Sequence, residues 1–295
     1  MTQERYEKSL RRPLGDGALV RLQALAGWRG RAGDVSLRAV EYLPWSDPHV
    51  LVMERVRGVG LGEIIARAGR AATVSPRLRE ALGAAELAGA WLAAFHAFPA
   101  EAPLEPWDAP ARIAAAEANV KALVSLGLSG GLADRLLMLA DADADAAVDG
   151  GQPVTIHGDF KPDNLMLAGE ELIGVDMEGY HRGSSLVDLG QFLAALYLAR
   201  SGCVWGNGRP ETWRRLGAAF LRSYRAGGGT IPPGLTCRMV ECLCGELVRL
   251  AARGGALFWC LRGRRLMLRT LQDLTGAEQI APVGTEAADD EDDDG

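Results

Sequence analysis

Five polar residues near the middle of the chain have the types and the order that phosphoryl transfer requires. The segment 155–176 reads T-I-H-G-D-F-K-P-D-N-L-M-L-A-G-E-E-L-I-G-V-D, and the five residues in it are His157, Asp159, Lys161, Asn164 and Asp176. Transfer of a phosphoryl group from a nucleotide needs a carboxylate that takes the acceptor's hydroxyl proton, together with ligands for magnesium. Asp159 can be that carboxylate. Asn164 and Asp176 can be the ligands, because Mg²⁺ prefers oxygen.

The spacing of the two candidate ligands predicts that they converge. Two apolar runs, 165–167 and 172–175, are separated by Ala-Gly-Glu-Glu, which predicts a short hairpin with glycine in its turn. A hairpin brings its two outer ends together. Asn164 and Asp176 flank the hairpin, so we expect both side chains to reach one metal ion.

H-G-D-F-K-P-D-N followed by V-D-M-E-G resembles the catalytic loop and metal-binding segment of the aminoglycoside phosphotransferase and choline kinase family. Members of this family are small-molecule kinases with a protein-kinase-like fold. The resemblance implies that Asp159 is the catalytic base, that Asn164 and Asp176 bind Mg²⁺, and that ATP is the phosphoryl donor. It also implies that His157 is buried and braces the loop, and that Lys161 neutralises charge on the moving phosphate.

Two further residues follow from the same resemblance. Asp188 would hold the catalytic loop from the next helix. His96, in W-L-A-A-F-H, resembles the end of the family's helix that leads towards the loop. A histidine at such a position is more often a core residue than a ligand, so we leave His96 out of the site.

The resemblance assigns nucleotide contacts to the N-terminal part of the chain. Segment 49–58, H-V-L-V-M-E-R-V-R-G, resembles the strand and hinge that bind adenine through the backbone, which makes Met53, Glu54 and Arg55 candidate nucleotide-binding residues. The carbonyl near Met53 and the amide near Arg55 would make these bonds, although a plain core strand explains the pattern nearly as well. Lys8 is the sole lysine before residue 121 and the sole candidate to pair with nucleotide phosphates. The alternative for Lys8 is a solvated terminal side chain.

The N-terminal part is shorter than a complete N-lobe. Such a lobe has a glycine-rich loop between two strands, then the lysine strand, then a helix that carries an acidic partner for the lysine. Gly15-Asp16-Gly17 fits the start of a helix over 18–26, and the middle of this helix holds Arg21 and Gln23 rather than an acid. We therefore expect either a sequence that begins inside the N-lobe or a protein without a nucleotide cover.

Beyond the hinge, apolar periodicity predicts a mainly helical region. The expected helices cover residues 61–67, 76–98, 111–126, 132–144, 186–200, 212–226, 235–253 and 256–275. Only eleven residues separate Asp176 from Asp188, too few for the segment with which protein kinases hold a peptide. This interval favours a small-molecule hydroxyl acceptor. Trp205, Trp213, Tyr224 and Trp259 could form an aromatic cage for a quaternary amine, although aromatic residues at helical spacing are more often core.

Charge and composition exclude some partners. The net charge of the 295 residues is −6, but seven acids lie in the last ten residues, and the remaining 32 basic and 31 acidic side chains nearly balance. A nearly neutral body lacks the clustered basic face typical of nucleic-acid binding, so we exclude nucleic acid as a partner. No apolar run approaches the roughly 18 residues of a membrane span, so we expect no membrane partner.

The cysteine count and the N-terminus favour the cytoplasm. The five cysteines are an odd number, and residues 1–10 lack the apolar core of a signal peptide. Cys237, Cys242 and Cys244 fall in a helical pattern without a nearby histidine, which favours buried thiols over a zinc site.

The sequence thus predicts an α+β, protein-kinase-like two-lobed fold. We expect a shortened N-lobe over residues 1–57, a mainly helical C-lobe over 58–281 and a disordered acidic tail over 282–295. The expected function is transfer of the γ-phosphoryl group of ATP, with Mg²⁺, to a hydroxyl of a small metabolite, sugar, amino alcohol or aminoglycoside. The alternative is a pseudokinase-like module that binds a nucleotide or ligand without transfer. The missing glycine-rich loop favours this alternative, and the intact base and metal ligands argue against it.

Overall fold

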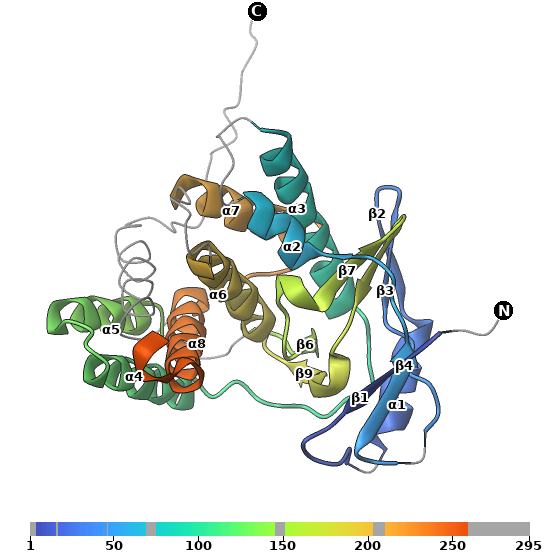
Figure 1. The fold of residues 1–295 in the computed structure, drawn as a ribbon, viewed down its shortest axis with the longest axis horizontal. Coiled ribbons are helices and arrows are strands. Elements are labelled where there is room, and N and C mark those ends of the chain that lie inside the picture. The colour runs from blue at the N-terminus through green and yellow to red at the C-terminus, as the bar shows by residue number, and fades with distance from the viewer. Residues whose placement is uncertain are drawn as a thin grey trace, which may run out of the picture.

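The computed structural model of the chain describes residues 4–15, 17–45, 47–68, 75–144, 151–202 and 210–258. A small strand-rich part at the N-terminus lies beside a larger helical part (Figure 1). The N-terminal elements are β1 (Arg5–Ser9), α1 (Ala18–Ala24), β2 (Arg29–Ala32), β3 (Val35–Ala39) and β4 (Val50–Glu54). The mixed composition and the arrangement of these two parts confirm the expected α+β class.

Strand β4 lies between two neighbours and forms the centre of the N-terminal part. It pairs antiparallel with β1, so that Tyr6 lies opposite Met53 and Lys8 opposite Leu51. On its other side, Tyr42 forms an antiparallel bridge with Met53. Leu51 and Met53 are buried, which confirms the expected apolar strand within 49–58.

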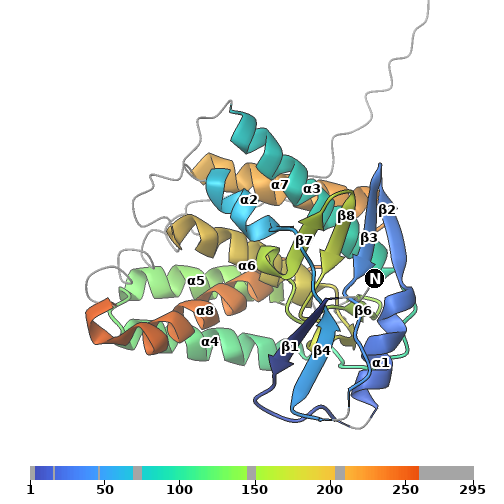
Figure 2. The ribbon, with the colours of Figure 1, turned by 45° about the vertical axis from the view of Figure 1, so that its right-hand side comes forward.

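A second sheet joins the N-terminal strands to the hairpin that carries the candidate ligands. Its strand order is β2-β3-β8-β7-β5, with β5 (Val59–Gly60), β7 (Leu165–Ala168) and β8 (Glu171–Gly174). Strands β7 and β8 form the predicted hairpin, and Gly169 in its turn has φ +61°. Strand β3 runs parallel to β8, with Ser36 opposite Glu171 (Figure 2). A boundary at residue 57 therefore does not divide the strands into separate sheets.

The rest of the described chain is mainly helical, as predicted. Its helices are α2 (Leu61–Ala68), α3 (Pro76–His96), α4 (Ala109–Ser125), α5 (Gly130–Ala144), α6 (Leu186–Gly202), α7 (Pro210–Ala226) and α8 (Leu235–Phe258). Ser75 Oγ caps α3 by accepting a hydrogen bond from the Leu78 N–H at 3.2 Å, with proline in the first turn. Most of the helix expected over 256–275, and the acidic tail, lie outside the described residues.

Aromatic rings connect the two parts of the protein. Trp91 of α3 stacks on Phe160 with 5.6 Å between ring centroids and meets Trp28 edge-on at 4.9 Å. Its Nε1 donates a hydrogen bond to the Arg38 carbonyl of β3 at 3.1 Å. A Cβ at Gly174 would lie 2.3 Å from the Trp91 ring, so β8 approaches α3 closely only because this residue is glycine.

The cysteines of α8 lie in the core. Cys237 and Cys244 are buried, as predicted, and burial raises the pKa of the Cys244 thiol to about 12 and that of Cys242 to about 11. Cys203 and Cys260 lie outside the described residues. None of the helices within the described residues has the length and apolar character needed to cross a membrane.

Candidate active site

Strand β6 (Val154–Ile156) delivers the polar loop that the sequence singles out, residues 157–164. It pairs antiparallel with β9 (His181–Gly183), which follows the second ligand segment. The loop ends in a 3₁₀-helix, Pro162–Asn164, that leads directly into β7. Both expected ligand segments are thereby tied to the same small region of backbone.

His157 is fully buried and joins the loop to the end of β8. Its Nδ1 accepts a hydrogen bond from the Asp159 N–H at 3.3 Å, so its Nε2 carries the proton and donates to the Val175 carbonyl at 2.9 Å. Val175 immediately precedes Asp176. The brace that the family resemblance implies for His157 has this geometry.

Asp188 of α6 holds the loop backbone from the other side. Its carboxylate accepts hydrogen bonds from the backbone N–H groups of His157 at 2.7 Å and Gly158 at 3.0 Å, and it contacts His96 Nε2 at 3.2 Å. Burial opposes ionisation of this carboxyl group. The hydrogen bond from His96 and the backbone hydrogen bond from His157 outweigh burial and hold the pKa of Asp188 below its ordinary value.

His96 therefore belongs to the support of the site, which the sequence analysis missed. Its Nδ1 lies 2.8 Å from the hydroxyl of Tyr224, and burial raises the pKa of Tyr224 to about 12. Tyr224 and Trp213 are both buried in the core and cannot line an open aromatic cage. Trp205 and Trp259 lie outside the described residues.

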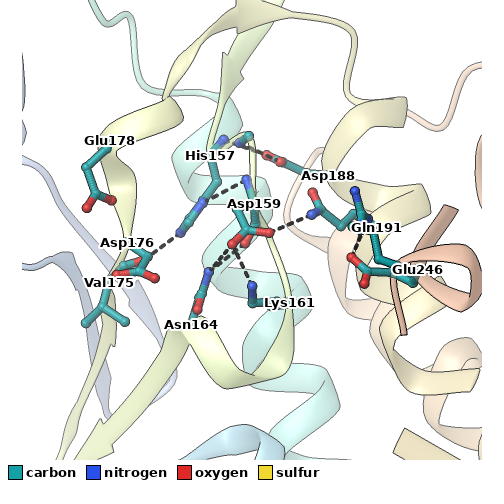
Figure 3. Close-up of polar contacts among 12 residues, drawn as sticks. His157, Asp159, Lys161, Asn164, Val175, Asp176, Glu178, Asp188, Gln191 and Glu246 are labelled. Carbon is teal, nitrogen blue, oxygen red and sulfur yellow. Dashed lines mark hydrogen bonds and ion pairs between the residues drawn. The ribbon is translucent and has the colours of Figure 1, made fainter. Parts of the chain in front are cut away.

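Three side chains donate hydrogen bonds to the carboxylate of Asp159 (Figure 3). Oδ2 accepts from Lys161 Nζ at 2.6 Å and from Asn164 Nδ2 at 3.0 Å. Oδ1 accepts from Gln191 Nε2 of α6 at 2.7 Å. The sequence predicts the first two neighbours, but it gives no signal for Gln191, which lies far along the chain. The Asp159 side chain remains 40% exposed and can be reached by a substrate.

Asn164 and Asp176 converge at the open end of the hairpin, as predicted. The Val175 N–H donates to the Asn164 carbonyl at 2.9 Å, which fixes the two ends next to each other. Asp176 has a left-handed backbone, with φ 61° and ψ 45°, a conformation that Asp tolerates better than most residues. The turn also places the Met177 N–H against the Tyr42 hydroxyl at 2.9 Å.

The donor atoms at this point suit magnesium. Asn164 uses its Nδ2 on Asp159, which leaves its carbonyl oxygen Oδ1 for a cation. Asp176 adds a half-exposed carboxylate. No group of three or more His, Cys, Asp or Glu residues that could hold a metal occurs within the described ranges. Mg²⁺ commonly takes one or two protein oxygens and completes its shell with phosphates and water, which fits this pair.

Lys8 of β1 points at the same place and is not a solvated terminal lysine. Its Nζ lies 2.9 Å from Asp176 Oδ1 and 2.7 Å from Glu178 Oε1. Burial lowers the pKa of Lys8, but the two carboxylates outweigh it and the pKa is raised above its ordinary value. Helix α1 carries no acidic residue, so the partner of this lysine comes from the segment after Asp176. The sequence analysis missed Glu178.

The expected adenine contacts need a correction. The Arg55 N–H donates to the Glu4 carbonyl at 2.9 Å and continues the pairing of β1 with β4, so this amide is already occupied. Met53 is paired on both sides of its strand. The amide of Glu54 is engaged as well, because it donates to the Glu41 carbonyl at 2.9 Å.

The side chain of Glu54 has a structural contact. It accepts a two-pronged ion pair from Arg38 and a hydrogen bond from the Glu41 N–H at 2.9 Å. Arg38 Nε also donates to Glu171 of β8 at 3.1 Å. This cluster joins β4 to the hairpin of β7 and β8, which the candidate metal ligands flank.

Comparisons with known proteins show the family and the fold of the chain. Residues 20–233 match the sequence profile of the phosphotransferase enzyme family (APH). A search of curated proteins gives no significant match. Among solved structures, a glucosamine kinase in complex with glucosamine, ADP and inorganic phosphate shares 18% identity at a TM-score of 0.58, covering 93% of this chain and 72% of that one.

Two other solved structures have the same fold. A choline/ethanolamine kinase family protein from Mesorhizobium loti shares 17% identity at a TM-score of 0.52, covering 92% of this chain and 87% of that one. A thermostable mutant of aminoglycoside phosphotransferase APH(4)-Ia, in a ternary complex with ADP and hygromycin B, shares 13% identity at a TM-score of 0.52, covering 91% and 84%. The protein-kinase-like fold and the long profile match agree, and the chain belongs to the phosphotransferase enzyme family.

Proposed function

We propose that the protein transfers the γ-phosphoryl group of ATP, with Mg²⁺, to a hydroxyl group of a small molecule. The observation that carries the proposal is the surroundings of Asp159. Its carboxylate is exposed enough to be reached and is oriented by Lys161, Asn164 and Gln191 at 2.6 to 3.0 Å. The same loop places Asn164 beside the segment of Asp176, so the base and the metal ligands share one rigid support.

In this proposal each residue has a separate task. Asp159 orients the acceptor's hydroxyl group and takes its proton as the oxygen attacks the γ-phosphorus atom. Asn164 Oδ1 and the Asp176 carboxylate hold Mg²⁺, which when bound neutralises negative charge on the phosphates. Lys161 lies beside Asp159 and steadies the transferring group. Most of the catalytic effect would come from positioning and electrostatics rather than from covalent chemistry.

The nucleotide would lie between β4 and the hairpin. Lys8 pairs with Asp176 and Glu178 and is close enough to the metal ligands to contact a phosphate. Adenine would use the carbonyl of Glu54 and the amide of Val56, because the amides of Glu54 and Arg55 already donate to Glu41 and Glu4. This keeps the hinge that the sequence predicts and moves the expected amide contact by one residue.

A small acceptor suits the short interval after Asp176. In the structure this interval holds a single 3₁₀ turn, Met177–Gly179, and the three-residue strand β9 before α6 begins. Such a segment offers no platform for a peptide. The solved complexes named above contain glucosamine and hygromycin B, which both bear hydroxyl and amino groups, and we propose an acceptor of this broad kind. We also propose a cytoplasmic location, which the odd number of cysteines favours.

One observation favours the alternative, a module that binds ligand without transfer. Lys8 Nζ lies 2.9 Å from Asp176 Oδ1, so an ammonium group contacts an oxygen that the metal would need. Phosphotransfer and ligand binding without transfer differ in whether Mg²⁺ binds Asp176. In phosphotransfer Mg²⁺ takes an oxygen of Asp176 when ATP binds, whereas in a binding module Asp176 could stay paired with Lys8 alone.

The test of the proposed function is Asp159→Ala. Release of ADP from Mg·ATP would be measured with a panel of glucosamine, choline, ethanolamine and hygromycin B as acceptors. We expect turnover to be lost, by about 10²-fold to 10⁴-fold, with nucleotide binding largely intact. Asp134→Ala, on the exposed face of α5, is the matched control and should behave like the wild type. Retained turnover in Asp159→Ala would sink the assignment.

A further inference from the structure

The hydrogen bonds of Asp159 are unevenly divided between its two oxygens. An ionised carboxylate has about four positions for hydrogen-bond donors, two on each oxygen. Oδ2 receives Lys161 Nζ and Asn164 Nδ2, which fill both of its positions. Oδ1 receives one donor within the described residues, the amide of Gln191 at 2.7 Å. The position left for another donor is therefore on Oδ1.

We propose that Gln191 is a positioning residue that orients Asp159 so that Oδ1, not Oδ2, takes the acceptor's proton. The inference rests on the proposed function and adds the side from which the acceptor hydroxyl approaches Asp159. The acceptor hydroxyl reaches Asp159 from the side of α6, opposite Lys161. This places α6 along the acceptor site and Lys161 away from it, toward the phosphate.

The amide of Gln191 has one workable orientation. With Nε2 toward Asp159 it donates to a carboxylate, and a flipped amide would instead set its oxygen against Oδ1, two acceptors in contact. Its Oε1 is buried and has no hydrogen-bond partner among the described residues. No competing bond to Oε1 within that part of the chain therefore turns the amide away from Asp159.

Helix α6 holds the loop at two levels. Asp188 and Gln191 are three residues apart and lie on one face of the helix. Asp188 bonds the loop backbone at His157 and Gly158, and Gln191 bonds the side chain of Asp159. The helix packs closely against α8 at Gly190. A Cβ at this position would lie 2.4 Å from Arg238 Cγ, so the close approach depends on glycine. The orientation of the carboxylate thus follows from the packing of α6.

The transfer step balances with Oδ1 as the proton acceptor. The acceptor oxygen forms a bond to the γ-phosphorus, and its proton moves to Asp159 Oδ1. The bond between the γ-phosphorus and the β–γ bridging oxygen breaks, and its electron pair stays on the leaving ADP. Oδ2 keeps its hydrogen bonds to Lys161 and Asn164 throughout, so the carboxylate need not rotate.

The experiment compares two variants at one position with a control. Gln191→Leu removes the donor at similar volume, and Gln191→Glu keeps the shape but replaces the donor by a carboxylate that repels Asp159. Gln23→Leu, on α1, makes the same chemical change at a glutamine that has no contact with Asp159. ADP release would be measured with Mg·ATP and each of glucosamine, hygromycin B and water as the phosphoryl acceptor.

We expect kcat to fall about 10-fold to 100-fold in Gln191→Leu and further in Gln191→Glu, with KM for ATP and the melting temperature near those of the wild type and of Gln23→Leu. A wild-type kcat in Gln191→Leu, together with loss of turnover in Asp159→Ala, would overturn the role of Gln191 and leave the proposed function standing. If Asp159→Ala retained turnover, the proposed function itself would be contradicted.

A crystal structure of Gln191→Leu gives a second readout that needs no turnover. If Gln191 sets the orientation, the Asp159 carboxylate should rotate about its Cβ–Cγ bond and release one of its contacts to Lys161 or Asn164. An unchanged carboxylate in the variant would show that those two residues alone fix its orientation, and the proposal would be wrong.

Discussion

The ammonium group of Lys8 lies 2.7 Å from a carboxylate oxygen of Glu178, so β1 is tied to the segment that follows Asp176. Helix α1 has no acid for this lysine. The residue that would bind phosphate is therefore positioned by the same segment that carries the proposed metal ligand. A shift of α1 alone would leave this ion pair in place.

Replacing Lys8 should weaken nucleotide binding. We expect Lys8→Met to reduce the affinity for Mg·ATP about 10-fold, or about 1.4 kcal/mol, because a phosphate contact is lost. Glu178→Gln should have a smaller effect, and the double variant should bind about as well as Lys8→Met, since the two residues act together. Titration calorimetry gives the affinities. The control is Lys121→Met, which breaks an exposed ion pair with Glu117. If this control lost as much affinity for Mg·ATP as Lys8→Met, Lys8 would not be the residue that binds phosphate.

Asp176, the proposed metal ligand, should be required for stabilisation by nucleotide. ATP with Mg²⁺ at a hundred times its dissociation constant adds about 2.7 kcal/mol to the free energy of unfolding. In a protein of this size the melting temperature should rise by roughly 5–10 °C. Asp176→Asn tolerates the left-handed backbone but loses the charge, and it should lose most of this shift. A full shift in the variant would argue that Asp176 does not bind the metal.

The buried carboxylate of Asp188 should make the free energy of unfolding depend on pH. Its pKa is lowered in the folded state, so its contribution is present above the unfolded pKa near 4 and is lost as the pH falls through the folded pKa. We expect Asp188→Asn to be destabilised by about 2–4 kcal/mol at pH 7.

Urea unfolding of the wild type and Asp188→Asn from pH 7 to pH 3 would measure this dependence. The difference in unfolding free energy should shrink below about pH 4. Asp134→Asn, at an exposed position of α5, should show no such change. A difference that stays constant over the whole range would mean that the ionised form of Asp188 contributes nothing.

Arg38 should matter more for stability than an exposed arginine. Arg38→Met leaves the largely buried carboxylate of Glu54 without its ion pair, and we expect a loss of about 2–4 kcal/mol. The double variant Arg38→Met with Glu54→Met should recover part of this loss. Arg57→Met breaks the exposed ion pair with Glu4 and should cost about 0–1 kcal/mol. Similar losses in the two single variants, measured by urea unfolding, would refute this ranking.

The sequence predicts the local parts of the site well. The hairpin, its glycine turn and the convergence of Asn164 with Asp176 depend on neighbours within about a dozen residues, so apolar runs and turn residues suffice to predict them. The cap at Ser75 is local in the same way. For His157 and Asp188, the family motif supplied an expectation that the contacts of both residues match.

The missed residues make contacts between distant segments. His96, Glu178 and Gln191 each act through a partner that no local pattern specifies, and His96 looks like an ordinary core residue until Asp188 is placed beside it. The contact expected of the Arg55 amide failed for a related reason. An apolar run shows that a strand is buried, but not which of its amides face a neighbouring strand.

The pairing of β3 with β8 constrains the order in which the chain can fold during synthesis. Ser36 pairs opposite Glu171, so one edge of β3 lacks its neighbour until the second half of the protein has left the ribosome. At usual elongation rates this wait is on the order of ten seconds. An open strand edge invites pairing with other chains, so products that end before residue 171 should aggregate rather than accumulate as a folded N-terminal fragment.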